Sequence, residues 1–486
     1  MREEAGRTGA GRAVVVGAGI AGLAAAHRLL GRGARVTVLE ASDRVGGKLL
    51  PGEIAGTRVD LGAESLLARR PEAVDLAREA GLGDRLRPPA TATASIWTRG
   101  ALRPMPKGHV MGVPGTAAAL AGVLSEEGLA RIGREAGLPR TELGEDVAVG
   151  EYVAARLGRE VVDRLVEPLL GGVYAGDAYR ISMRSAVPQL YQAAKTHASL
   201  TGAVRDIQAR AAAARQTGPV FMGIEGGVGT LPLAVAESVR ARGGEIVTGA
   251  PVTELRREGG GTWRVVAGDR VLRADAVIVA VPAPAAAVLL RAEAPAAAAE
   301  LAAVEYASMA LVTLAYRRTE TALPEGSGFL VPPVDGHTIK ASTFASQKWD
   351  WIAGDNPGLL VLRTSVGRYG ETEILRRDDA ELVDLSRQDL REATGLDAAP
   401  VEARVTRWTD GLPQYPVGHH ARVARVREHV AKLPGLALCG AQFDGVGIPA
   451  CIASAYAAVD QLGGDPGAVQ ELTAHPVQSL HGGAGE

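Results

Sequence analysis

Cysteine is scarce in this chain, and neither sign of charge dominates. The 486 residues include two cysteines, Cys439 and Cys451, which excludes a disulfide scaffold and a cysteine-rich metal site. The formal net charge is −2, whereas a protein that binds nucleic acid through its phosphates shows a basic excess. We therefore expect no metal and no nucleic-acid partner. Local cations must hold any anionic ligand.

Long uninterrupted hydrophobic runs are also absent. The most apolar stretch, residues 281–304, is interrupted by Arg291, Glu293 and Glu300, whereas a membrane-spanning helix needs about 20 nearly uninterrupted apolar residues. The first twelve residues lack the apolar centre of a signal peptide. These absences favour a cytoplasmic setting with reduced cysteines, and they leave peripheral contact with a membrane open.

The N-terminal region has the pattern of a βαβ unit that binds a dinucleotide. Residues 13–16 are typical of a buried strand, the glycine-rich turn 17–22 follows, and a helical pattern leads to a second strand at 35–39. Glu40 ends that strand, where its carboxylate can accept ribose hydroxyls. An acidic residue at this place disfavours the 2′-phosphate of NADP.

The glycines of the turn have separate physical roles. Gly17 permits the tight turn, Gly19 lets the backbone approach a pyrophosphate, and Gly22 allows close packing of helix on strand. The positive end of the helix dipole then faces the phosphates. The residues expected to contact the nucleotide here are Gly17, Gly19, Ile20, Ala21, Gly22, Glu40 and Ala41.

A second motif favours FAD over NAD. Arg44-Val45-Gly46-Gly47 comes directly after Glu40, and an ordinary NAD dehydrogenase has no need of it. The Arg-x-Gly-Gly pattern resembles the signature of amine-oxidase-type flavoproteins. That resemblance places Arg44 and Gly47 along the diphosphate and ribityl part of FAD.

The C-terminal region contains another glycine-rich turn, Gly445–Pro449, before a helix. Only 39 residues follow Gly447, too few for another nucleotide-binding domain. We expect this helix to begin at the flavin pyrimidine edge, where its amides stabilise negative charge on the reduced ring. The predicted contacts are Gly440, Val446, Gly447 and Ile448. A further glycine-rich segment, residues 226–232, has Pro232 where a third glycine is needed, so no NAD(P)H domain is expected and the substrate must reduce the flavin.

Nucleotide-type strands recur near residues 13–16, 275–281 and 436–439, and helical and β-rich stretches separate them. This order predicts an α/β fold: a doubly wound, Rossmann-like FAD-binding domain, interrupted by a helical domain and a β-rich substrate domain.

Several further motifs occur in a fixed order along residues 12–462. They are Gly62-Ala63-Glu64-Ser65, Pro104-Met105-Pro106-Lys107-Gly108, residues 167–177 (EPLLGGVYAGD), Thr406-Arg407-Trp408, residues 414–419 (QYPVGH) and Gly445–Pro449. With these motifs the chain resembles the oxygen-dependent protoporphyrinogen oxidase family. It is more similar to the Gram-positive branch, the coproporphyrinogen III oxidases that form coproporphyrin.

The resemblance implies a division of the chain and more flavin contacts. The FAD-binding domain takes residues 12–90, 221–285 and 402–465; the substrate domain 91–107 and 286–401; the helical domain 108–220; and 466–486 form a disordered tail. The additional FAD contacts are Lys48, Gly62, Ala63, Glu64, Ser65, Val252 and Trp408. Glu64 departs from the aspartate found in some members of the branch, a conservative change.

The reaction implied is the six-electron oxidation of a porphyrinogen in haem biosynthesis, in three flavin cycles, with oxygen as acceptor and hydrogen peroxide as product. No general base stands out, and we expect the adjacent His419 and His420 to be structural. Coproporphyrinogen has four propionates and should need several cationic partners. The candidates, with Arg69 as a further neighbour, are Arg70, Lys107, Arg363 and Arg368.

Three other functions stay open on the sequence. Protoporphyrinogen IX oxidase uses the same chemistry on a substrate with two propionates. A flavin amine oxidase or carotenoid desaturase shares the flavin fingerprint, although only 4% of the residues are aromatic and no aromatic cage is evident. A scaffold that uses FAD without turnover and delivers porphyrin to a ferrochelatase is the third.

Overall fold

Five parallel strands from distant parts of the chain form one sheet in the computed structural model, which describes residues 11–213 and 218–463. The strands, in sheet order, are β12 (Glu245–Val247), β2 (Arg35–Leu39), β1 (Arg12–Val16), β16 (Ala276–Val279) and β22 (Leu436–Leu438). Val14, Val15 and Val16 are almost fully buried, as a strand covered on both faces requires. The doubly wound α/β class predicted from the sequence is confirmed.

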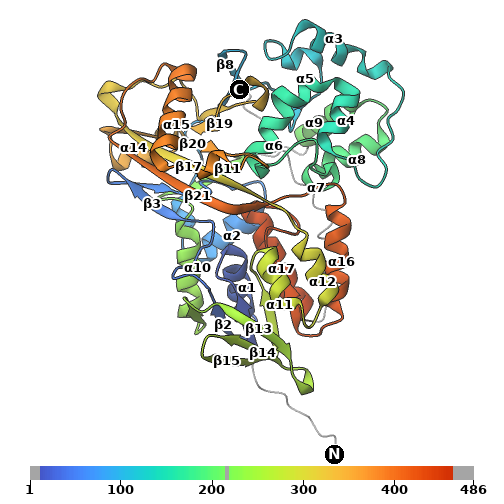
Figure 1. Ribbon diagram of the computed structural model, residues 1–486, viewed down its shortest axis with the longest axis vertical. Helices are drawn as coiled ribbons and strands as arrows, with labels where there is room; N and C mark the ends of the chain where they lie inside the picture. The colour runs from blue at the N-terminus through green and yellow to red at the C-terminus, as the bar shows by residue number, and fades with distance from the viewer. Residues whose placement is uncertain (1–10, 214–217, 464–486) are drawn as a thin grey trace, which may run out of the picture.

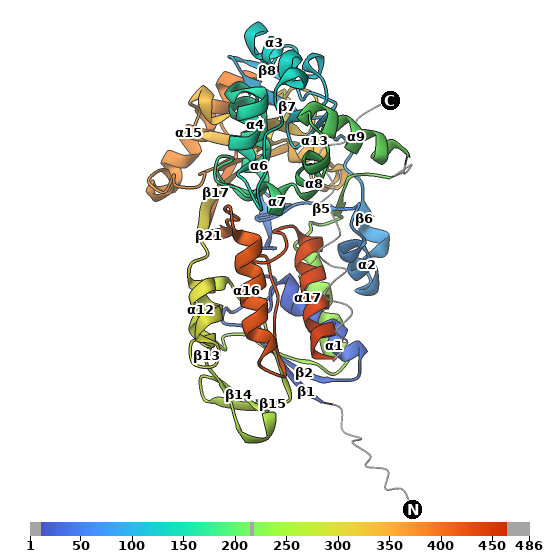
Figure 2. The same ribbon diagram turned by 90° about the vertical axis from the view of Figure 1, so that its right-hand side faces the viewer.

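Helices cover both faces of this sheet. One set is α1 (Ile20–Gly31), α2 (Pro71–Glu79), α10 (Thr230–Ala241) and α17 (Ile448–Leu462). The other is α11 (Ala283–Leu290), α12 (Pro295–Ala302) and α16 (His419–Ala431), with a small sheet of β13 (Val252–Arg257), β14 (Trp263–Ala267) and β15 (Arg270–Ala274). In Figure 2, α12 and α16 lie on one side, and α1 and α17 on the other. Each set closes its own apolar cluster against the sheet.

A seven-stranded mixed sheet forms the second unit (Figure 1). Its strands, in order, are β21 (Glu402–Pro413), β17 (Tyr306–Arg317), β20 (Leu359–Val366), β19 (Ile339–Thr343), β18 (Gly328–Leu330), β7 (Ser95–Thr98) and β8 (Ala101–Pro104). The helix α15 (Asp379–Thr394) covers one face and packs its leucines against Val312, Leu314 and Leu362. Toward the other face lie α13 (Ala345–Lys348), α14 (Asp350–Asp355) and the hairpin β3 (Pro51–Ile54) and β4 (Thr57–Asp60).

The third unit is helical and packs around one apolar cluster. Its helices are α3 (Glu126–Arg134), α4 (Val149–Leu157), α5 (Arg159–Val161), α6 (Glu167–Tyr174), α7 (Met183–Ala186), α8 (Pro188–Thr196) and α9 (Leu200–Ala213). A π-helical segment, Val162–Val166, leads directly into α6. Short strands join the units: β5 (Leu66–Leu67), β6 (Leu86–Arg87), β9 (His109–Val110), β10 (Val113–Pro114) and β11 (Phe221–Ile224).

The structure changes two boundaries of the predicted division. Residues 402–413 pair with β17 in the seven-stranded sheet, and not with the nucleotide-type sheet. Residues 286–302, expected in the substrate domain, form helices that pack on the five-stranded sheet. Residues 109–114 form a hairpin that packs in the cluster of the helical unit, within the predicted helical domain. The predicted tail, 466–486, lies outside the described residues.

Candidate functional site

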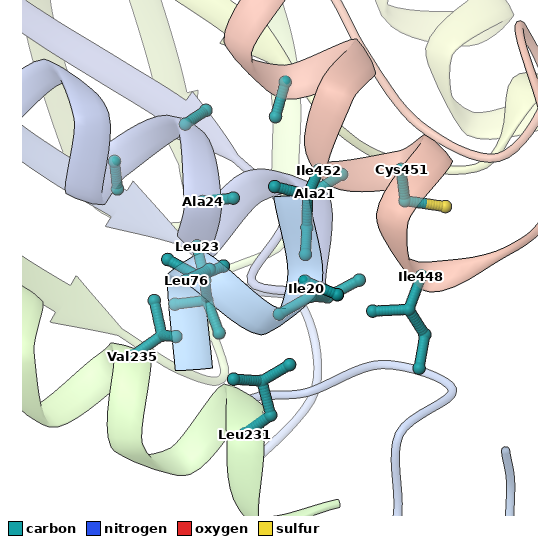
Figure 3. Packing of buried hydrophobic residues seen from close by; sticks show 14 of the residues in the cluster. Ile20, Ala21, Leu23, Ala24, Leu76, Leu231, Val235, Ile448, Cys451 and Ile452 are labelled. Carbon is teal, nitrogen blue, oxygen red and sulfur yellow. The ribbon is translucent and has the colours of Figure 1, made fainter. Parts of the chain in front are cut away.

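Two helix N-termini meet at the carboxyl edge of the five-stranded sheet. Gly19 precedes α1 and Gly447 precedes α17, and neither cap has a side-chain hydrogen bond to its helix. The first N–H groups of a helix have no partner within the helix, and both dipoles present their positive ends here. Ile20 and Ile448 lie close together in the cluster that joins the two helices (Figure 3). This edge is where doubly wound sheets bind ligands with anionic groups.

The glycines of the first turn are required for packing at two of three positions. A Cβ on Gly22 would lie 1.9 Å from the carbonyl oxygen of Gly17, and a Cβ on Gly17 would lie 2.8 Å from that of Ala280. Gly17 also has φ of +104°, which disfavours other residues. Gly19 is different, because a Cβ there would meet no protein atom within 4 Å. Its open side leaves room for a ligand against the backbone.

Glu40 and Arg44 shape the loops beside this turn. One oxygen of Glu40 accepts the N–H of Ala18 at 2.7 Å, and the other accepts the N–H and hydroxyl of Ser42 at 2.9 and 2.8 Å. Each carboxylate oxygen still has lone-pair capacity for a further donor such as a ribose hydroxyl. Arg44 donates to the carbonyl of Gly47 at 2.8 Å and so closes its own loop. Exposed Ala41 follows Glu40 at the open edge.

The side chain of Asp60, the last residue of β4, binds the glycine-rich turn of residues 226–232. Its carboxylate accepts the N–H groups of Val228 and Gly229, each at 2.8 Å, immediately before α10. A Cβ on Gly227 would lie 2.8 Å from the same carboxylate. Burial raises the pKa of Asp60 to about 6 although both hydrogen bonds oppose the shift. A carboxylate of the chain itself therefore accepts the amides of this turn.

A three-residue charge cluster holds the Gly62–Ser65 segment. Glu64 is buried and pairs with Lys348 (2.7 Å) and Arg363 (3.2 Å). Burial raises the pKa of Glu64, but the two cations outweigh that effect and leave the pKa below its usual value. Arg363 also donates to the carbonyl oxygen of Gly62 at 2.7 Å. The structure gives Arg363 a role in positioning this loop, and the substrate contact that the sequence predicts for it stays a prediction.

Other predicted flavin contacts gather around the same loop. A Cβ on Gly62 would lie 2.1 Å from the carbonyl oxygen of Lys48 and 3.2 Å from the indole of Trp408. Trp408 donates to the carbonyl of Leu61 at 3.0 Å. The remaining predicted contacts lie as follows: Ala63 and Lys48 are exposed, Ser65, Val252 and Val446 are half-buried, and Gly440 donates its N–H to the hydroxyl of Ser454.

The predicted substrate cations lie apart from one another. Arg70 makes a two-point contact with Glu72, at 2.5 and 3.3 Å. Lys107 is exposed between β8 and β9. Arg368 is buried and donates to the carbonyl of Val331 at 3.2 Å. All four substrate contacts stay predictions, and Arg368 belongs to a buried cluster between α6 and the sheet.

The histidine prediction agrees with the packing, and one carboxylate was missed. His419 stacks on Tyr415, its Nε2 lies 2.9 Å from the carbonyl oxygen of Phe443, and burial lowers its pKa to about 4, so it stays neutral. Glu167 is buried, and its Oε2 has no hydrogen-bond partner. An acidic residue within the apolar motif 167–177 was the signal that could have indicated it. Lys348 was also missed, because nothing local links it to Glu64.

Comparison with known proteins agrees with this geometry. The family model described as flavin containing amine oxidoreductase matches residues 20–463. The chain belongs to this family. It is similar to a coproporphyrinogen III oxidase of Mycobacterium bovis, with 40% identity over 92% of this chain and 96% of that protein. It is also similar to the protoporphyrinogen oxidase of Bos taurus, with 32% identity over 94% of this chain and 99% of that protein.

Among solved structures, one described as a putative protoporphyrinogen oxidase from Exiguobacterium sp. 255-15 superposes with a TM-score of 0.82 and 34% identity, over 93% of this chain and 99% of that one. Membership of this family implies a flavin cofactor. In the described part of the chain, no helix is long and apolar enough to span a bilayer.

Proposed function

We propose that this protein uses FAD to oxidise coproporphyrinogen III to coproporphyrin III, with oxygen as the acceptor and hydrogen peroxide as the product, in haem biosynthesis. The observation that carries the proposal is the 40% identity to the mycobacterial coproporphyrinogen III oxidase over nearly the whole of both chains. The flavin cradle supports it, because both helix N-termini and the Glu64 loop needed to hold the cofactor are in place.

The residues present fit FAD, including its adenosine half. Glu40 directly follows β2 and would accept the ribose hydroxyls, and the amides after Gly19 would hold the diphosphate. The N-terminus of α17 supplies amides for the pyrimidine edge, where a helix dipole stabilises the negative charge of the reduced ring. When bound, the flavin supplies the acceptor for a hydride from the substrate.

The chain's own residues orient the substrate and exclude water. The sheet face that carries Thr313 and Arg363 is directed toward the Gly62–Ser65 segment, since Arg363 donates to Gly62. The helical unit lies against the same sheet through α6, which contacts β18 and β19 (Figure 1). Arg70 and Lys107 are the proposed partners for substrate propionates, because guanidinium and ammonium groups bind carboxylates strongly.

Purified protein tests this proposal in two steps. Anaerobic addition of coproporphyrinogen III should bleach the absorbance of bound flavin, and admission of air should restore it and give fluorescent coproporphyrin and hydrogen peroxide. A protein that retains FAD yet oxidises neither coproporphyrinogen nor protoporphyrinogen refutes the proposal. Oxidation of an amine or of phytoene would instead support the amine oxidase or desaturase alternative.

Protoporphyrinogen IX is the second candidate substrate, favoured by the similarity to the Bos taurus enzyme. We expect kcat/KM to be higher for coproporphyrinogen because four propionates can use more cations than two. An equal or reversed ratio would contradict this preference. Protein that photoreduces but never reoxidises in air would favour the scaffold alternative, with ferrochelatase as the expected partner.

A further inference from the structure

Three buried ionisable side chains meet where the helical unit packs on the seven-stranded sheet. Glu167 begins α6, Lys340 belongs to β19, and Arg368 lies just beyond β20. Their residues are 9%, 6% and 8% exposed, although Glu, Lys and Arg are almost never buried unless paired. No hydrogen bond or ion pair within 4 Å joins Glu167 to either cation among the described residues.

Lys340 points toward this junction because of an irregularity in its strand. Ile339 and Ala341 pair with the consecutive residues Val366 and Ser365, so Lys340 is the extra residue of a β-bulge. A bulge redirects the side chain that it carries. The ammonium group donates to the carbonyl of Gly367 at 2.6 Å and lies 3.9 Å from the sulfur of Met309. It therefore lies beside the strand residues that continue toward Thr313 and the Gly62 loop.

The segment that carries Arg368 is tied to both strand and helix. Arg368 donates to Val331, and the N–H of Tyr369 donates to the carbonyl of Ala175 at 2.6 Å. Ala175 follows α6 in the left-handed conformation, with φ of +48°. The Glu167 side chain lies over Gly171, one turn further along α6, where a Cβ would be in ordinary van der Waals contact with Oε1 at 3.5 Å.

The electrostatic environment keeps this cluster close to the point of gaining or losing protons at neutral pH. Burial is the largest effect on Glu167 and raises its pKa to about 7, against the attraction of Arg368 and Lys340. Burial also lowers the pKa of Lys340 to about 7, and Arg368 adds to that shift. The other charged groups that face the cluster are Glu371, which lies 3.6 Å from Arg368 and raises the pKa of both groups, and Asp177, which raises the pKa of Glu167. The two groups titrate as a coupled pair.

We propose that Glu167, Lys340 and Arg368 form a specificity-determining cluster, whose buried positive charge strengthens the binding of a carboxylate-bearing tetrapyrrole beside the sheet face that carries Met309. The inference rests on the proposed function and adds a group of residues that act on the substrate through the electric field and through the seating of α6. Charges in the protein interior are screened far less by salt than charges at the surface.

The proposal predicts how the affinity for the tetrapyrrole changes with pH. At pH 8 the favoured state has an ionised Glu167, a neutral Lys340 and a charged Arg368, so the cluster is close to neutral. At pH 6 Glu167 is protonated and Lys340 is charged, so the cluster carries two positive charges. The propionates of the substrate stay ionised throughout this range. Affinity for the tetrapyrrole should therefore increase as the pH falls from 8 to 6.

Binding of coproporphyrin III to the flavin-loaded protein at pH 6 and pH 8 tests the proposal. The native protein should bind coproporphyrin III about fivefold more tightly at pH 6 than at pH 8. A change of this size is at the lower end of the affinity changes that coupled sites show. Glu167→Gln removes the negative charge that the cluster carries at pH 8, so it should bind more tightly than the native protein at pH 8. Lys340→Met lacks the positive charge that the native cluster gains at pH 6, so it should bind more weakly than the native protein at pH 6 and change less with pH. Lys432→Met, on the surface beside Glu428, is the matched control and should follow the native profile.

Opposite shifts of the two variants support the proposal, because a purely structural role would weaken binding in both. Superimposable pH profiles of native protein and variants, each with full flavin absorbance and a native thermal transition, would overturn it. The aerobic assay keeps the two proposals separate. A native protein that oxidises coproporphyrinogen but has flat, identical profiles refutes the cluster alone, and one that oxidises neither porphyrinogen refutes both.

Discussion

The pairing of Glu64 with Lys348 can be measured by removing each charge without changing side-chain shape greatly. Glu64→Gln removes the carboxylate charge, and Lys348→Met removes the ammonium group. Glu64 is 9% exposed and holds both Lys348 and Arg363, so either change leaves a poorly solvated charge with fewer partners. The Gly62–Ser65 loop should then be held less firmly, because Arg363 connects Glu64 to Gly62.

The magnitude follows from the burial of the pair. Removing one partner of a fully buried ion pair costs about 3–5 kcal/mol. Since Arg363 still pairs with Glu64 in Lys348→Met, we expect about 2–3 kcal/mol, closer to the value of a hydrogen bond to a charged group. The unfolding entropy of a chain this long is about 1 kcal/mol per kelvin, so Tm should fall by about 2–3 °C.

A double-mutant cycle over Glu64→Gln and Lys348→Met measures the interaction itself. We expect the sum of the unfolding free energies lost in the two single variants to exceed the loss in the double variant by about 1–2 kcal/mol. Flavin retention on dialysis is the second measurement, with Lys432→Met as control, and both single variants should lose flavin faster. Effects that add within about 0.5 kcal/mol, together with native flavin retention, would refute the reasoning.

Further predictions concern packing and pH. Gly22→Ala should purify without flavin absorbance because its Cβ would meet a backbone oxygen, whereas Gly31→Ala, in open space, should keep the flavin. His419 is neutral when folded, with a pKa of about 4 against 6.5 when unfolded, so the unfolded state takes up its proton first and stability falls as the pH drops from 6.5 to 4. The stability lost between pH 7 and pH 4 should be about 3 kcal/mol smaller in His419→Phe than in the native protein, and Tm at the two pH values measures this difference. Arg156→Met leaves the buried Glu135 unpaired and should cost about 3–5 kcal/mol in denaturant unfolding, an expectation that a loss below 1 kcal/mol contradicts.

Local patterns were enough to predict the nucleotide-type unit. The strand 35–39 and the helix after Gly19 depend on hydrophobic periodicity and on glycines within a few residues, so their prediction is confirmed. The strand 359–366 was predictable for the same reason. The assignment of strand 402–413 was wrong, because its partner β17 lies about a hundred residues earlier and no local signal shows which sheet a strand joins.

The amino-acid sequence by itself determined the fold class and the flavin family, since these depend on short motifs whose geometry is local. Only the tertiary structure decided which charges meet. Lys348 reaches Glu64 across 284 positions, and a one-residue bulge directs Lys340 toward the junction with α6. Such contacts depend on register and burial, and burial is the largest of the effects that raise the pKa of Glu167 to about 7.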